Sequence, residues 1–154
     1  MIDFASISKE DLERLEKQRE KEFEQAMNGI FVESQSNNLL INELRFNYNY
    51  LYMGKFLIQS QTGSKFEIHE INDEHIFIAF IGVPTEKRRQ GLGTQMMEEL
   101  TRIADTHGFK LSLNIDPKFG VGKRVLKKFY KKHGFVESEW YKNNAEMIRE
   151  AINN

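Results

Sequence analysis

A continuous apolar run, a basic loop and an amphipathic stretch follow one another in the second half of the chain. No polar side chain interrupts residues 76–83, which predicts a strand over 75–83 that is buried on both faces. Residues 92–107 carry apolar side chains at helical spacing, and Gly108 is a typical helix stop. The predicted buried face of this helix carries Met96, Leu100, Ile103 and Ala104.

A further strand completes a crossover unit. Leu111, Leu113 and Ile115 alternate with polar residues, which predicts a strand over residues 110–115. Two strands joined through a helix in one sheet must run parallel, and ligands of such units lie at the carboxyl ends of the strands. The loop that follows the first strand, residues 83–94, falls at this position.

The N-terminal third is dominated by charge. A short strand over 1–7 is predicted to precede a long charged helix over 9–28, with Ser8 as its N-cap. The apolar positions of this helix form a thin stripe of Leu12, Leu15, Phe23 and Met27, so it is expected to pack on one side only. Residues 34–43 are rich in Asn and Ser and are predicted to form a loop.

From Phe46 onward the pattern indicates an antiparallel meander. Its first strand places four aromatic residues on one face, Phe46, Tyr48, Tyr50 and Tyr52. We interpret these aromatics as core, with the lining of an acceptor groove as the alternative. Turns are predicted at three places, Gly54, residues 62–64 and residues 72–73. Residues 145–150 fit a closing strand, although a short helix is compatible with the same pattern.

The loop at residues 83–94 has the chemistry of an anion site. It reads Val-Pro-Thr-Glu-Lys-Arg-Arg-Gln-Gly-Leu-Gly-Thr and leads into a helix whose first N–H groups lack partners within the helix. Gly91 and Gly93 lack a Cβ, so backbone amides can approach phosphate oxygens closely. The third glycine of the dinucleotide fingerprint and the Gly-Lys-Ser/Thr of nucleotide hydrolases are both absent. An ordinary solvated basic turn is the competing interpretation.

The pattern Arg88-x-x-Gly91-x-Gly93 in this setting resembles the hallmark of the GNAT superfamily, the acetyl-coenzyme A-dependent N-acyltransferases. A second segment, Leu126-Lys-Lys-Phe129-Tyr130-Lys-Lys-His-Gly134-Phe135, is similar to the helix-to-strand passage of that family. Residues 146–150 are similar to its last strand, and the three matches follow the family order over roughly residues 70–150. The resemblance implies one domain over residues 1–154 with a mixed α/β fold, a central mixed sheet of six to seven strands and about four flanking helices.

The resemblance also implies a site and a reaction. The backbone of residues 81–83, hence Ile81 and Val83, would bind the pantetheine arm, with Gly82 permitting close approach or a bulge. The pyrophosphate would lie on the loop and helix start formed by Arg88, Arg89, Gln90, Gly91, Leu92, Gly93 and Thr94. Tyr130 would be the general acid that protonates the departing thiolate. The expected reaction is direct transfer of acetyl from acetyl-CoA to an amine of a small molecule or a protein.

Two departures from the family pattern leave roles open. Residues 76–83 offer no titratable side chain where several relatives have a catalytic carboxylate. The base is therefore one of Glu70, Glu74, His75 and Glu137, or a water relay. Lys123 and Leu126 occupy the positions of a family Asn-x-x-Ala motif, so the coenzyme contact of that asparagine is in doubt; Lys123 or Arg124 could reach the nucleotide phosphate. A coenzyme-binding sensor or interaction module without catalysis is the alternative function.

Composition narrows the remaining possibilities. With 22 basic and 23 acidic side chains the net charge is −1, which gives no reason to expect nucleic acid or an anionic membrane as partner. The chain has no cysteine, so no disulfide and no acyl-thiol intermediate are expected, and the four histidines show no metal-ligand spacing. No apolar run reaches membrane length and no signal peptide is evident, so we expect a cytoplasmic monomer or homodimer.

Overall fold

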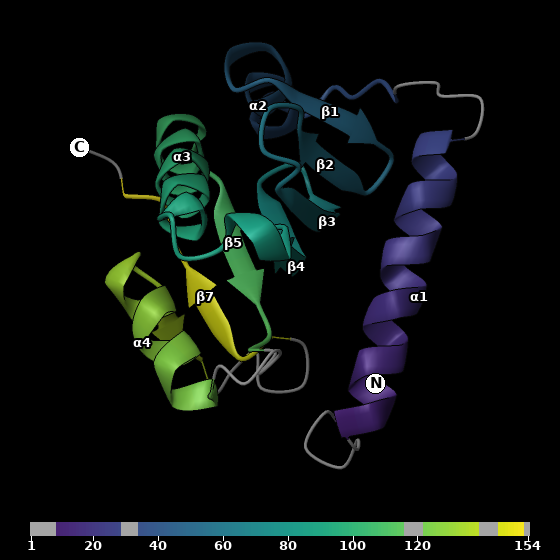
Figure 1. Cartoon of the computed structure of the whole chain (residues 1–154). Coiled ribbons are helices and arrows are strands. Elements are labelled where there is room, and N and C mark those ends of the chain that lie inside the picture. The colour runs from purple at the N-terminus through teal and green to yellow at the C-terminus, as the bar shows by residue number, and fades with distance from the viewer. Residues whose placement is uncertain (1–8, 29–33, 116–121, 139–144, 153–154) are drawn as a thin grey trace.

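The computed structural model describes residues 9–28, 34–115, 122–138 and 145–152. Within them a seven-stranded sheet has the order β1-β2-β3-β4-β5-β7-β6 (Figure 1). The strands are β1 (Tyr50–Met53), β2 (Phe56–Gln59), β3 (Lys65–Asn72), β4 (His75–Gly82), β5 (Lys110–Leu113), β6 (Val136–Glu137) and β7 (Met147–Arg149). The helices are α1 (Lys9–Asn28), α2 (Leu39–Asn47), α3 (Leu92–His107) and α4 (Lys123–Lys132), with a 3₁₀ turn η1 at Thr85–Lys87. The predicted strand over 1–7 and the Ser8 cap lie outside the described residues.

The crossover unit is confirmed. β4 and β5 pair in parallel from His75 opposite Lys110 to Ile78 opposite Leu113, and α3 connects them. The α3 face that the sequence predicts is buried, and Gly108 caps its end at φ 77°. β1 to β4 form the predicted antiparallel meander, and β7 forms the predicted closing strand as an antiparallel neighbour of β5.

The prediction that the strand over 75–83 is buried on both faces is wrong. Ile76 and Ile78 are buried, but Phe77 and residues 79–82 are only half-buried. The reason is that the second half of β4 lines cavities instead of packing against other elements along its whole length. An apolar run therefore marks a strand here but does not show what covers it.

A bulge lies within this half of β4. Ile68 of β3 pairs with Ile78 and Glu67 pairs with Phe80, so two residues on β3 are matched by three on β4. The extra residue changes which face the following side chains occupy, because strand side chains alternate. Ile81 thereby joins Ile78 on the core face, and Phe80 turns to the opposite face with Glu67. The bulge is at Ala79, not at Gly82.

Residues 34–43 are not a continuous loop, because α2 begins at Leu39. Asn38 is its N-cap, and its Oδ1 accepts a hydrogen bond from the Ile41 backbone N–H at 3.2 Å. Leu40, Ile41 and Leu44 are fully buried in the core. An asparagine of this Asn-rich segment, Asn38, therefore caps a helix, which is a common role of asparagine.

The predicted aromatic strand begins later than expected. Phe46 belongs to α2, is 72 % exposed and stacks with the Arg45 guanidinium, while Tyr48 caps that helix. Tyr50 and Tyr52 are in β1 and are buried, and the Tyr50 ring lies 5.8 Å from that of Phe66. The core interpretation therefore holds for Tyr50 and Tyr52, and in part for Tyr48, which packs half-buried against the core.

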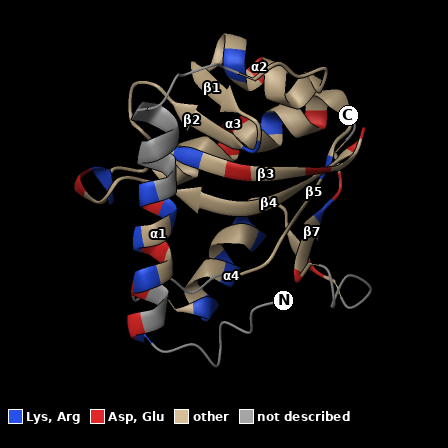
Figure 2. Cartoon of the chain, turned by 90° about the vertical axis from the view of Figure 1, so that its right-hand side faces the viewer, with Lys and Arg blue, Asp and Glu red and all other residues tan. Residues whose placement is uncertain are grey.

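α1 has the predicted bounds and lies apart from α3 and α4, on the other side of the molecule (Figure 1). Acidic and basic residues follow one another along it as it passes the ends of β3 and β4 (Figure 2). Its Arg19 guanidinium lies 4.9 Å from the centre of the Phe80 ring and 3.8 Å from a Glu67 carboxylate oxygen. Among the described helices, none is long and apolar enough to cross a membrane.

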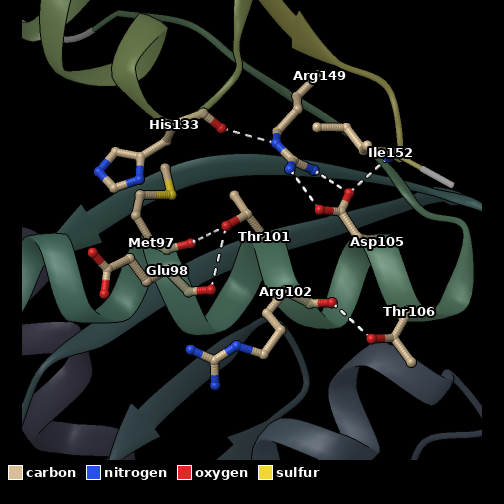
Figure 3. A network of polar contacts seen from close by, with 9 residues as sticks. All are labelled: Met97, Glu98, Thr101, Arg102, Asp105, Thr106, His133, Arg149 and Ile152. Carbon is tan, nitrogen blue, oxygen red and sulfur yellow. Dashed lines mark hydrogen bonds and ion pairs between the residues drawn. The ribbon is translucent and has the colours of Figure 1, made fainter. Parts of the chain in front are cut away.

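An ion pair between buried Arg149 and half-buried Asp105 ties α3, α4 and β7 together (Figure 3). Arg149, 4 % exposed, donates two hydrogen bonds to the Asp105 carboxylate at 2.7 and 2.8 Å. Its Nε donates to the His133 carbonyl at the end of α4, at 2.8 Å. Asp105 also accepts the Ile152 backbone N–H at 2.8 Å. Gly134 lies against the guanidinium, because a Cβ there would be 2.9 Å from Arg149 Nε. This network fixes the C-terminal end of α4.

Acid should weaken the fold through this network. The hydrogen bond from Arg149 is the main reason why the Asp105 pKa is lowered from its usual value. A carboxylate whose pKa is lower in the folded state stabilises the fold above its unfolded pKa, and this contribution is lost as pH falls through the folded pKa. We expect the urea concentration at the unfolding midpoint to decrease as the pH is lowered below about 4. In the Asp105→Asn variant this decrease should be less steep. If the stability of both proteins decreased equally with falling pH, the Arg149–Asp105 pair would not be the cause.

Candidate active site

The two parallel strands separate at the centre of the sheet. Their pairing ends at Ile78 opposite Leu113, although β4 continues to Gly82 and keeps its partner β3 throughout. The β5-facing edge of residues 79–82 therefore has no neighbouring strand in the described sheet. Backbone N–H and C=O groups on such an edge are available to an extended ligand.

A cavity of about 390 Å³ occupies this opening. It is bounded by β4 and the loop after it, by the start of α3, by the end of β5 and by α4. Most of its lining is apolar. The polar side chains that line it are Arg88, Asn114 and Tyr130. The cavity thus extends from the first turn of α3, at Gly93, to Phe129 and Tyr130 of α4.

Five of the ten predicted site residues line this cavity: Ile81, Val83, Arg88, Gly93 and Tyr130. The other five, Arg89, Gln90, Gly91, Leu92 and Thr94, form the loop and the first turn of α3 beside it. The bulge at Ala79 places Ile81 on the core face of the sheet, and both Ile81 and Val83 pack against the core at the end of β4.

The first turn of α3 leaves its amides without a side-chain cap. Gly91 is the N-cap, at φ 78°, and provides no side-chain acceptor, and no acidic residue lies in the first turn. The N–H groups of Leu92, Gly93 and Thr94 precede the first helical hydrogen bond, which the Gln95 N–H donates to the Gly91 carbonyl at 3.0 Å. An anion is the natural partner for such a helix start.

Basic side chains complete the loop. The Arg88 Nε donates to the Val83 carbonyl at 3.1 Å, which holds its side chain across the turn next to the cavity. Arg89 is exposed and has a φ of 64°, a left-handed conformation that is uncommon for residues other than glycine. Such strain is found where a loop is shaped for binding.

The three glycines have different roles. A Cβ on Gly91 or on Gly93 would meet no protein atom within 4 Å, so neither is needed to avoid a clash within the chain. Gly91 is required by its positive φ, whereas Gly93 has an ordinary helical conformation. A Cβ on Gly82 would lie 2.5 and 2.8 Å from ring atoms of Phe80. Gly82 therefore makes room for the Phe80 ring.

Tyr130 reaches the cavity from the last turns of α4. Its ring packs edge-on against those of Phe129 and Phe135, at 5.4 and 5.9 Å, and is half-buried. The Tyr130 carbonyl accepts the N–H groups of His133 and Phe135, so the chain reverses immediately after this residue. The Arg149 network holds the same turn through the His133 carbonyl.

None of the four proposed base residues is among those that line the cavity. Glu70 and Glu74 are exposed near the other end of the sheet, and Glu137 pairs with Lys127 and Lys131 on the surface. His75 Nε2 lies 2.7 Å from Ser112 Oγ, and burial lowers its pKa. Lys123 pairs with Glu146 at 3.0 Å, at the start of α4.

The structure adds two residues that the sequence did not indicate. Asn114 follows β5 and lines the cavity opposite β4. Glu67 is 7 % exposed, and it pairs across the sheet with Phe80, a residue of the cavity lining. The Glu67 position depends on the β3–β4 register, which a strand pattern does not determine.

The chain matches one protein-family model and is distantly similar in fold to solved structures. The family model described as an acetyltransferase (GNAT) domain matches residues 57–137, more than half of the chain. A search of curated proteins found no significant match. A GNAT family acetyltransferase from Elizabethkingia anophelis with acetyl-CoA bound is 16% identical, with a TM-score of 0.48 over 80% of this chain and 94% of that one. Ard1 from Thermoplasma volcanium is 16% identical, with a TM-score of 0.44 over 96% and 95% of the two chains.

The family match covers β2 to β6, and so includes the separated strands, the loop with its helix start and Tyr130. The family assignment rests on the length of this match, because the solved structures are only distantly similar to the chain. The chain belongs to the GNAT family of acetyltransferases.

Proposed function

We propose that this protein is an N-acetyltransferase that moves an acetyl group from acetyl-CoA to an amine by direct attack in a ternary complex. The observation that carries the proposal is the apolar cavity that runs from the start of α3, which has no side-chain cap, past the open edge of β4, to Tyr130. One end of the cavity offers an anion site for the phosphates of acetyl-CoA. The other end offers the Tyr130 hydroxyl as a proton donor for the departing thiolate.

The coenzyme would be held mainly by backbone groups. Its pyrophosphate would accept hydrogen bonds from the amides at the start of α3, with the Arg88 guanidinium adding charge. Its pantetheine arm would pair with the β4 edge near Ile81 and Val83, where no strand competes. The apolar walls would exclude water from the thioester, which strengthens the polar interactions within the site.

The transfer itself needs one proton donor. The amine nitrogen attacks the thioester carbonyl, the C–S bond breaks, and the thiolate takes a proton from the Tyr130 hydroxyl. The nitrogen loses one proton as the amide forms, and water returns a proton to the tyrosinate. A thiol has a pKa near ~8.5 and a phenol near ~10, so this transfer is only about 1.5 pKa units uphill. No cysteine is present, so an acyl-thiol enzyme is not part of the path.

The acceptor must arrive neutral or lose its proton to water. Among the described residues that line the cavity, no carboxylate or imidazole is present to serve as base. Deprotonating a lysine side chain of pKa ~10.4 near pH 7 costs about 4.6 kcal/mol, against about 1 kcal/mol for an α-amine of pKa ~7.8. An amine of low pKa is therefore favoured. The same observation supports a second candidate, a coenzyme-binding module without catalysis.

Gly93 provides the test of coenzyme binding. A valine side chain at this position meets no protein atom within 4 Å of its Cβ but projects from a residue that lines the cavity. We expect Gly93→Val to remain folded and to lose more than about tenfold in acetyl-CoA affinity by calorimetry, equivalent to about 1.4 kcal/mol. Gly93→Ala is the matched control, since the family pattern admits alanine here. Unchanged affinity in both variants would contradict the proposed pyrophosphate site.

A further inference from the structure

Asn114 lies at the end of the cavity where β4 and β5 still pair. The parallel pairing of these strands ends at Ile78 opposite Leu113, and Asn114 is the next residue after Leu113. One residue further along both strands, Asn114 therefore lies across the opening from Ala79, where β4 bulges. Both residues line the cavity. The side chain of Asn114 is thus available at the point where the two strands separate.

A hydrogen bond to the backbone determines how the Asn114 amide is oriented. Its Oδ1 accepts the Glu146 backbone N–H at 2.8 Å, next to β7. Because a backbone N–H can only donate, the oxygen must lie on that side, and Nδ2 is the end of the amide that remains for the cavity. No described residue accepts a hydrogen bond from Nδ2. Since Nδ2 can only donate, Asn114 can bind an oxygen of a ligand but cannot take a proton from an amine.

The place of Asn114 agrees with the length of the coenzyme arm. About thirteen bonds separate the pyrophosphate from the thioester sulfur, which corresponds to about four residues of extended chain, or roughly 14 Å. An arm that runs along β4 from Val83 therefore ends near Ala79. This brings the thioester carbonyl to the part of the cavity that Asn114 lines.

We propose that Asn114 is a catalytic residue, which donates a hydrogen bond from Nδ2 to the thioester oxygen as this atom becomes negatively charged. The inference rests on the proposed acetyltransferase function and names a further residue of the same site. When the amine attacks, the oxygen takes up the electron pair of the C=O bond, and it returns the pair as the C–S bond breaks. Asn114 neither gains nor loses a proton. The apolar lining strengthens the interaction of a fixed donor with this charge.

The Asn114→Asp variant separates this role from a structural one. Aspartate keeps an oxygen for the Glu146 N–H, so the fold should be retained, but it replaces the donor with a second acceptor. We expect kcat to fall by at least about 10²-fold, the effect of losing one oxyanion donor. The affinity for coenzyme A, which lacks the acetyl carbonyl, should stay within about threefold by calorimetry.

The Asn114→Ala variant removes the whole amide. The Glu146 N–H also donates to the Leu113 carbonyl at 3.1 Å, so it keeps a partner and the loss of stability should be small. We expect kcat to fall by about 10²-fold in this variant too. The matched control is Asn42→Asp, because the Asn42 Nδ2 donates to the Ser36 carbonyl at 2.8 Å, outside the cavity lining. Its turnover should stay within about twofold of the wild type.

Infrared spectra of bound acetyl-CoA, isotope-labelled at the acetyl carbonyl, test the same contact without turnover. A hydrogen bond to the oxygen draws electron density from the C=O bond and weakens it. The carbonyl band should therefore lie at lower frequency in the wild type than in Asn114→Ala. Equal band positions in the two proteins would overturn the inference.

The kinetic outcomes separate this inference from the function on which it rests. If turnover of Asn114→Asp stayed within about twofold of the wild type, or increased because the carboxylate acts as a base, the donor role would be wrong and the transferase intact. A loss of coenzyme A affinity with unchanged kcat in Asn114→Ala would assign the side chain to the coenzyme arm and also overturn the inference. A wild type that acetylates no amine would overturn the proposed function itself.

Discussion

Replacing Arg149 with methionine is expected to lower the free energy of unfolding by about 3 kcal/mol, the lower end for breaking a buried ion pair by removing one partner. The change leaves the Asp105 carboxylate and the His133 carbonyl without the three hydrogen bonds that the guanidinium donates. We choose the lower end because the Asp105 side chain is 27 % exposed, so water can partly replace the lost partner. Urea unfolding at neutral pH measures the effect.

An exposed pair provides the control. Lys110→Met breaks the ion pair of Lys110 with Glu150, whose side chain is 65 % exposed, and should cost less than about 1 kcal/mol. The same Arg149→Met protein should also lose turnover, because the His133 carbonyl belongs to the turn that follows Tyr130. A loss of stability no larger than that of the control would show that the network does not hold α3, α4 and β7 together.

Replacing Tyr130 with phenylalanine is expected to lower kcat by about 10²-fold while acetyl-CoA affinity stays near normal, within the usual range for loss of a general acid. The substitution keeps the ring and its edge-on contacts with Phe129 and Phe135, so stability should change little. It removes the hydroxyl whose proton we assign to the departing thiolate. Steady-state turnover and calorimetry on the same preparation separate these effects.

The pH dependence sharpens this test. The deficit of Tyr130→Phe should shrink as pH rises, because a thiolate of pKa near ~8.5 then departs without needing a proton. Tyr48→Phe is the matched control: Tyr48 is also partly buried against the core, and its hydroxyl contacts Arg102 at 3.4 Å away from the cavity lining. Turnover of Tyr130→Phe within twofold of the parent, with the acceptor saturating, would show that solvent provides the proton.

The crossover unit could be predicted closely because its signals are local. The apolar run and Gly108 define β4 and the end of α3, and Gly91 with Gly93 locates the loop between them. α2 could not be predicted in the same way. Its Asn- and Ser-rich approach has a loop composition, and only the buried Leu40, Ile41 and Leu44 show that Asn38 starts a helix.

The remaining errors concern features that depend on tertiary structure. The bulge at Ala79 is a matter of register between β3 and β4, and the side chains around it give no sign of it in sequence. The position of Glu67 opposite Phe80 depends on the same register. A cavity between α1 and β4 is lined by Glu16, Arg19 and Phe80, so its existence depends on where α1 packs. Glu16 and Arg19 are far from Phe80 along the chain. Strand and helix patterns carry no information about such distant contacts.

The most direct test of the account is whether the protein transfers acetyl groups or only binds the coenzyme. Purified protein is incubated with acetyl-CoA and a panel of amines; free thiol is measured continuously, and the amines are analysed by mass spectrometry. The account predicts thiol release that depends on the amine and equals the amount of N-acetylated product. Binding of acetyl-CoA with no amine-dependent thiol release from any acceptor would contradict it and establish the coenzyme-binding module instead.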